Sequence, residues 1–103
     1  MFVFRKITTF WAPVKITLPG GEVQECECEF VYLDDAQWEE KSKLSTFDFL
    51  KQHWKGWRGI VDENEQEVPF SDAQLEAFLA HAYIATGALA GYSGARAGLR
   101  AKN

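Results

Sequence analysis

The side chains best suited to metal or redox chemistry are two cysteines and two histidines. Cys26 and Cys28 stand two residues apart in the segment ECECEF, so on a strand both thiols point to one face, which is poor geometry for a disulfide between them. A zinc site would need two further ligands, and His53 and His81 show no recognisable ligand spacing. We therefore expect no metal and no cofactor, and we interpret both cysteines as buried, reduced thiols.

Acid–base and nucleophilic catalysis have few candidates. The sequence contains no Gly-x-Ser-x-Gly motif, no His-Glu-x-x-His motif and no phosphate-binding loop. Its acidic residues fall in strand, turn and helix-start contexts, where structure and solubility explain them. His53 falls near the end of a predicted helix, where the helix dipole favours a positive charge, so it needs no catalytic role. We expect a protein that is not an enzyme.

The segment HWKGWRG combines aromatic and basic residues and permits three interpretations. Trp54 and Trp57, with the adjacent bases, could form a stacking platform for single-stranded nucleic acid. Both tryptophans could instead anchor a helix end in the core. In the third interpretation one tryptophan is buried and the other, with Arg58, contacts a protein partner, as Trp and Arg often do at interfaces. Nucleic-acid binding is the least favoured, because a net charge of -4 and a pI near 5.1 oppose phosphate neutralisation.

Length and charge predict one domain over residues 1–103. A chain of 103 residues that is 47% hydrophobic can build one core. We expect a cytoplasmic protein without membrane contact, because the sequence shows no secretion signal and no apolar run long enough to span a bilayer. Residues 22–40 carry only acidic charges and residues 77–103 only basic ones. This segregation fits either a homo-oligomer or a solvated surface without a partner.

Strands are expected first along the chain. Apolar and polar residues alternate over residues 14–18 and 25–32, and a Pro-Gly-Gly turn joins the two segments, which predicts an antiparallel hairpin with one wet face. Lys15 is expected near the glutamates of the second strand. The preceding residues, 2–11, could add a further strand or an arm. These features predict an N-terminal hairpin or small sheet.

Helices are expected after the hairpin. Three residue pairs have the spacing of helix N-caps, namely Asp34 with Gln37, Ser45 with Asp48, and Ser71 with Gln74. The first pair predicts a short helix over residues 35–44. The second predicts a helix over residues 46–54 that ends at Gly56, with an apolar stripe of Phe47, Leu50 and Trp54.

The third cap predicts one long helix that follows a small hairpin or loop in residues 58–70. Its apolar stripe runs through Leu75, Phe78, Leu79, Ala82, Thr86 and Leu89. Glycines recur from Gly87 to Gly98, so we expect this helix to fray or bend there. Residues 92–103 are then either a flexible tail that a partner orders or a plain frayed terminus. The fold class is α+β, with a mainly helical C-terminal half.

The order of these features resembles the tail assembly chaperones of long-tailed bacteriophages. The similarity lies in FWAPVKITLPGG, a short acidic middle, GWRGIVDENEQEVPFSDAQLEAFL, the Ala-rich AHAYIATGALAG and an end close to KN. It covers most of the chain, and none of its motifs is catalytic. The resemblance implies a non-enzymatic protein that binds the tape-measure protein, keeps its helices in solution and helps recruit tail-tube subunits. The chain looks like the short form of such chaperones.

The resemblance identifies no functional residues, so the contact residues follow from physical patterns alone. A chaperone for a long helical client needs exposed apolar or aromatic side chains within an acidic surround. We expect Trp57, Arg58, Phe78 and Tyr83 to form this partner-binding surface. Two alternatives stay open. The first is a structural virion protein for tail completion or head–tail joining, and the second is a small single-stranded nucleic-acid-binding regulator.

Overall fold

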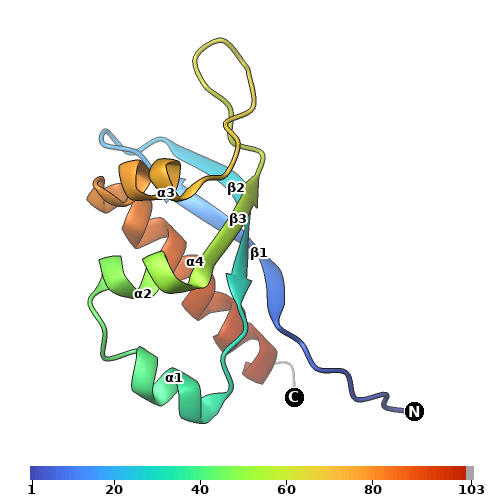
Figure 1. Ribbon diagram of the computed structural model, residues 1–103. Coiled ribbons are helices and arrows are strands. Elements are labelled where there is room, and N and C mark those ends of the chain that lie inside the picture. The colour runs from blue at the N-terminus through green and yellow to red at the C-terminus, as the bar shows by residue number, and fades with distance from the viewer. Residues whose placement is uncertain (102–103) are drawn as a thin grey trace.

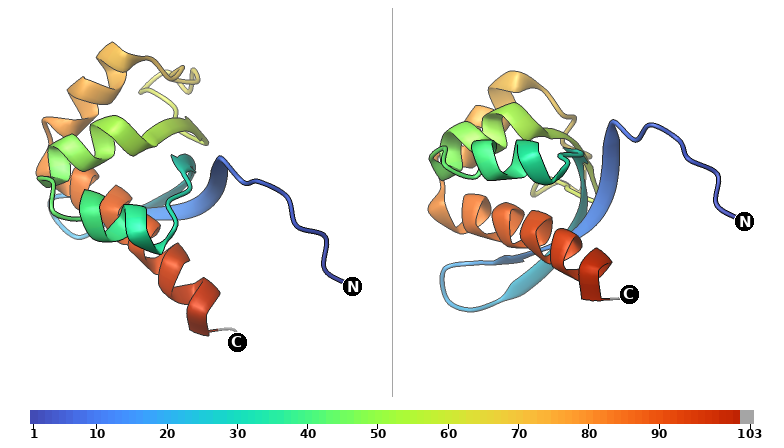
Figure 2. Two further views of the ribbon diagram at one scale, coloured as in Figure 1. Left: turned by 60° about the horizontal axis from the view of Figure 1, so that its bottom comes forward. Right: turned by 90° about the horizontal axis from the view of Figure 1, so that it is seen from below.

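The strands and helices form two layers (Figure 1). The computed structural model describes residues 1–101, the last three by their backbone alone. Within this range an antiparallel sheet of order β1-β2-β3 carries the helices on one face, as Figure 2 shows. The elements are β1 (Thr9–Thr17), β2 (Val23–Val31), α1 (Asp35–Lys41), α2 (Thr46–His53), β3 (Trp54–Arg58), α3 (Asp72–Leu79) and α4 (Ala82–Ala101). The predicted α+β class is confirmed.

The hairpin of β1 and β2 follows from turn chemistry and alternation. Gly20 and Gly21 have φ angles of 105° and 102°, which glycine adopts without the strain that a side chain would cause. Along both strands most residues that face the helices are apolar, and those that face away are mostly polar. Lys15 lies directly opposite Glu25, as predicted. β1 begins at Thr9, earlier than predicted, because its first residues also pair with β2.

All three predicted N-caps are confirmed. The side chains of Asp34, Ser45 and Ser71 accept hydrogen bonds from the backbone N–H groups of Gln37, Asp48 and Gln74, at 2.8, 3.1 and 3.1 Å. At Asp34 the capping box is complete, because Gln37 Oε1 accepts from the Asp34 N–H at 3.0 Å. Helix starts are local features, which explains why short sequence patterns located them.

The segment WKGWR forms strand β3, which corrects the predicted helix that ends at Gly56. Trp54 takes extended angles (φ -94°, ψ 111°) and pairs with Phe30 of β2. This pairing brings residues far apart in the sequence together, so no local stripe reveals it. The predicted stripe of α2 is also wrong at Phe47, which is exposed, whereas Phe49 is buried.

The predicted long C-terminal helix is two helices. α3 ends at Leu79 and α4 begins at Ala82, and the carbonyl of His81 accepts from the N–H of Ala85 at 3.2 Å as the new helix starts. The break changes which positions face the core. Thr86, which belongs to the predicted stripe, is exposed, whereas α4 buries Ala85, Ala88 and Tyr92.

Two glycines of α4, Gly87 and Gly91, allow close packing, and the helix continues through the glycine-containing segment where the sequence predicts fraying or a bend. A Cβ added at Gly87 would lie 2.7 Å from the carbonyl oxygen of Lys15, and one added at Gly91 would lie 2.7 Å from a methyl carbon of Val14. Glycine therefore lets α4 lie directly on β1. Residues 92–101 belong to α4 in place of the predicted tail, and residues 102–103 lie outside the described residues. No helix within residues 1–101 is long and apolar enough to cross a membrane.

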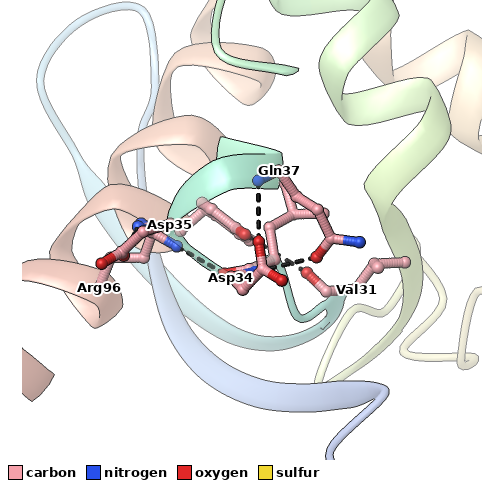
Figure 3. A network of polar contacts seen from close by, with 7 residues as sticks. Val31, Asp34, Asp35, Gln37 and Arg96 are labelled. Atoms are coloured by element: carbon pink, nitrogen blue, oxygen red, sulfur yellow. Dashed lines mark hydrogen bonds and ion pairs between the residues drawn. The ribbon is translucent and has the colours of Figure 1, made fainter. Parts of the chain in front are cut away.

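Arg96 joins the C-terminal part of α4 to the start of α1 (Figure 3). Its guanidinium donates to the carbonyl oxygen of Leu33 at 2.7 Å and to the carboxylate of Asp35 at 3.1 Å. The same group lies 4.7 Å from the ring centroid of Trp38, within cation–π range. Helix propensity alone disfavours this glycine-containing segment. These contacts, together with packing, stabilise it as a helix.

Aromatic rings form the centre of the core around Tyr92. The ring centroids of Phe30, Phe49 and Trp38 lie 5.3, 5.2 and 5.6 Å from that of Tyr92. Their T-shaped and stacked arrangements match the preferred geometries of aromatic pairs. The Tyr92 hydroxyl donates to the carbonyl oxygen of Val31 at 3.4 Å. Sheet and helices therefore share one cluster of buried side chains.

Candidate functional site

The two cysteines form a thiol pair within the sheet. Both are free, and their sulfur atoms lie 3.8 Å apart. Cys28 is buried as predicted, whereas Cys26 is only half-buried. The hydrogen bond between the thiols lowers the pKa of Cys26, and the same bond together with burial raises the pKa of Cys28. Among the described residues, no group of three His, Cys, Asp or Glu side chains is placed to hold a metal ion.

His53 is a core residue. It is buried, and its Nδ1–H donates to the carbonyl oxygen of Phe49 at 2.6 Å. Burial lowers the pKa of His53 below its ordinary value. The positive charge expected from the helix dipole is therefore disfavoured, because desolvation opposes the charged form more strongly. His53 is a neutral packing residue next to the ring of Phe49.

Trp54 and Trp57 are both buried, so neither ring is available for stacking on nucleic-acid bases. Their indole N–H groups donate to backbone carbonyl oxygens, Trp54 to Gly56 at 3.0 Å and Trp57 to Val68 at 2.7 Å. The interpretation that both tryptophans anchor the core agrees with these positions, although they do so from a strand. Trp57 is therefore no exposed contact residue.

Arg58 lies on the opposite face of the sheet from the helices. Its Nε–H donates to Glu27 at 3.0 Å, and its guanidinium lies 4.2 Å from the ring centroid of Trp11. Because neighbouring residues of a strand point to opposite faces, Arg58 and Trp57 cannot share one surface. The four predicted contact residues therefore do not form a single site.

Phe78 and Tyr83 do lie together, on the wall of an open groove of about 880 Å³. The groove is bounded by the end of the hairpin, the loop of residues 59–69, and α3 and α4. Trp57 lies behind this wall, because its ring packs 4.8 Å from that of Phe78. Apolar lining residues include Ile16, Leu18, Ile60, Val68, Phe78 and Ile84. We call this feature the apolar groove.

Exposed acidic side chains surround the apolar groove. Glu25 comes from β2, whereas Asp62, Glu63 and Glu67 come from the projecting loop that stands at the top of Figure 1. We call these four residues the acidic rim. A groove with apolar walls and an acidic rim attracts a ligand with an apolar face and basic flanks.

The loop that carries most of the acidic rim is ordered by its own hydrogen bonds. The carboxylate of Asp62 accepts from the backbone N–H groups of Asn64 and Gln66, at 2.8 and 3.0 Å. Val61 and Glu67 form a β-bridge at its base. The small hairpin that the sequence suggested for this region is therefore present, and it holds the rim in place before any ligand binds.

Sequence patterns missed the aliphatic part of the apolar groove. Ile16 and Leu18 belong to the predicted hairpin, and Ile60 and Val68 flank the acidic turn, but no spacing relates these two pairs. The tertiary structure brings them to one place. Comparison of the chain with protein-family models, curated proteins and solved structures found no significant match.

Proposed function

We propose that this chain is a non-enzymatic tail assembly chaperone of a long-tailed phage, acting in the host cytoplasm, and that it binds the tape-measure protein in the apolar groove. The observation that supports binding is the groove itself, with apolar walls and an acidic rim. The identity of the client comes from the resemblance of the sequence to such chaperones. A tape-measure protein is long, helical and rich in apolar residues, as the resemblance implies.

The client segment that fits this chemistry is an amphipathic helix. A helix binds a groove through apolar residues spaced three and four apart on one face. The apolar contact comes from Phe78 and Tyr83 on one wall of the groove and from Ile60 and Val68 in the loop of residues 59–69. Lysines or arginines beside the apolar stripe of the client helix would pair with the acidic rim. This pairing would favour basic helices over other helices of equal hydrophobicity.

Helping to recruit tail-tube subunits is the second part of the proposed role. The outer face of the sheet, where Arg58 packs on Trp11, lies across the sheet from the helices. A chain that holds its client on one side and leaves another face open has room for a second protein. The cation–π pair of Trp11 and Arg58 consists of residue types that dominate interface hot spots.

Matched variants test the use of the groove. Val61 lines the apolar groove with 54% of its surface exposed, and Val23 is 55% exposed outside the groove lining. We expect Val61→Asp to weaken capture of the tape-measure protein by about tenfold, because it places a charge against an apolar client surface, whereas Val23→Asp leaves capture unchanged. Pull-down of each tagged variant from cells that express the late genes of the source phage, with mass spectrometry, measures this.

The same experiment separates the alternatives. Tape-measure protein in the pull-down, with this chain absent from mature virions, supports the chaperone. Equal capture by Val61→Asp and by the unaltered chain rules out the groove as the client site. Recovery of the chain in purified tails would make it a structural virion protein. Recovery of nucleic acid without tape-measure protein would favour a regulator. The burial of Trp54 and Trp57, the two candidate stacking residues, argues against that outcome.

A further inference from the structure

The N-terminal arm, residues 1–7, exposes apolar side chains that no contact within the fold covers. Phe2 and Phe4 have 82% and 80% of their surface exposed. Their ring centroids are 6.4 Å apart, so both rings lie on one side of the extended arm. The arm leaves the sheet at Thr8, whose carbonyl oxygen accepts from the N–H of Tyr32 at 2.9 Å. Figure 1 shows it directed away from the rest of the molecule.

The arm and the apolar groove are complementary in chemistry. The arm presents two aromatic rings next to two adjacent bases, Arg5 and Lys6, all exposed. The groove presents aliphatic and aromatic walls, and its acidic rim carries opposite charges at Glu63 and Glu67. An extended segment that places Phe2 and Phe4 on the walls brings Arg5 and Lys6 to the rim, a few ångströms further along the backbone.

The arm is poorly placed to enter the groove of its own chain. Ile16, where the groove lies, is seven residue steps along β1 from Thr9, which is about 24 Å at about 3.4 Å per residue. Phe4 is five residue steps before Thr9, a reach of at most about 18 Å, so both phenylalanine rings cannot lie in the groove of their own chain. The path along the helix-facing side is also filled, because Gly91 of α4 packs directly on Val14 of β1.

We propose that the N-terminal arm of one copy lies in the apolar groove of a second copy. The two surfaces in this contact are different, so it is a heterologous contact that joins copies into chains or closes them into a ring. It covers apolar surface on the arm and in the groove when no client is bound. The contact depends on this chain alone, so it stands or fails independently of the tape-measure protein.

Charge reversal tests this contact on side chains that are all exposed. The arm variant is Arg5→Glu with Lys6→Glu, and the rim variant is Glu63→Lys with Glu67→Lys. Each variant alone turns attraction into repulsion, so we expect self-association at low salt to weaken by about tenfold or more. Sedimentation velocity of the purified full chain over a concentration series, without any client, measures the effect.

Recombining the reversed charges makes the test specific. An equimolar mixture of the arm variant and the rim variant contains both matched pairs of arm and groove, so association should return in the mixture. The variant Lys43→Glu with Lys55→Glu changes net charge as the arm variant does, at exposed positions outside the arm and groove, and it should associate like the unaltered chain. A monomeric unaltered chain, unchanged association of both reversed variants, or no recovery in the mixture would overturn the proposal.

Discussion

His53 is a histidine that the fold keeps neutral. Its ring packs 4.5 Å from that of Phe49, and its Nδ1–H donates to the carbonyl oxygen of the same residue. Burial lowers the pKa of His53, and the nearby charges of Lys41 and Lys55 act in the same direction. Protonation inside the core would place a charge in an apolar environment, so acid acts against the folded state at this residue.

The stability of the chain should therefore depend on pH through His53. The unfolded chain binds a proton at this residue below its ordinary pKa of about 6.5, whereas the folded chain does not until a lower pH. With respect to this group, the free energy of unfolding then has its full value above about pH 6.5 and falls as the pH drops towards the pKa of His53 in the folded state. Urea unfolding at several pH values should show that His53→Gln reduces this slope and that His81→Gln, at an exposed position, keeps it. An unchanged slope in His53→Gln would contradict the assignment.

At the scale of elements, the contact of α4 with β1 determines how closely the two layers pack. Gly87 and Gly91 face the strand, whereas a Cβ at Gly94 would meet no atom within 4 Å. The first two glycines are required by close approach, and the third has no such requirement. The two Gly-x-x-x-Gly pairs of this helix therefore differ in role, because Gly87 and Gly91 lie on the side that contacts β1, whereas Gly94 and Gly98 do not.

Alanine substitution should separate these two classes of glycine. At Gly91 the new Cβ would lie 2.7 Å from a Val14 methyl carbon and 3.2 Å from the carbonyl oxygen of Pro13. We expect overpacking to outweigh the gain in helix propensity and to lower the free energy of unfolding by about 1–2 kcal/mol. Gly94→Ala should raise it by about 0.5–1 kcal/mol. Urea denaturation of both variants checks this, and stabilisation by Gly91→Ala would show that α4 is not pressed against β1.

At the scale of the whole molecule, the basic N-terminal arm and the acidic rim of the apolar groove lie apart. The basic N-terminal arm leaves from one end of β1, and the acidic rim stands at the other end of the molecule (Figure 1). Because these two features lie far apart on one chain, they can interact between copies more readily than within one. The proposed client and the proposed second copy then use the same groove.

Client binding and self-association should therefore compete. If the arm of a neighbour occupies the groove, only the free fraction binds the client, and the apparent affinity falls by that fraction. We expect the arm variant, Arg5→Glu with Lys6→Glu, to bind a tape-measure fragment more tightly than the unaltered chain at concentrations where the latter associates. Titration calorimetry at two protein concentrations measures this. Equal affinities under those conditions would show that the client and the arm do not share the groove.

The sequence alone located the features that depend on near neighbours. The three N-caps and the Pro-Gly-Gly hairpin were correctly predicted, because each depends on residues within a few positions of one another. The sequence also predicts partner contact at Phe78 and Tyr83; both line the apolar groove, and the contact itself stays a prediction. The break between the last two helices was not predicted, because the turn at His81 leaves an apolar pattern that also fits one helix.

Only the tertiary structure decided which aromatic residues are buried and where the apolar groove lies. Trp57 belongs to the core because β3 pairs with β2, and Arg58 lies on the other face because side chains alternate along that strand. Gly91 allows a close contact because Val14 lies beneath it. Each of these outcomes depends on segments distant in the sequence that meet after folding. Local periodicity indicates which face of a helix or strand is apolar. Packing of the whole chain determines which other element covers that face.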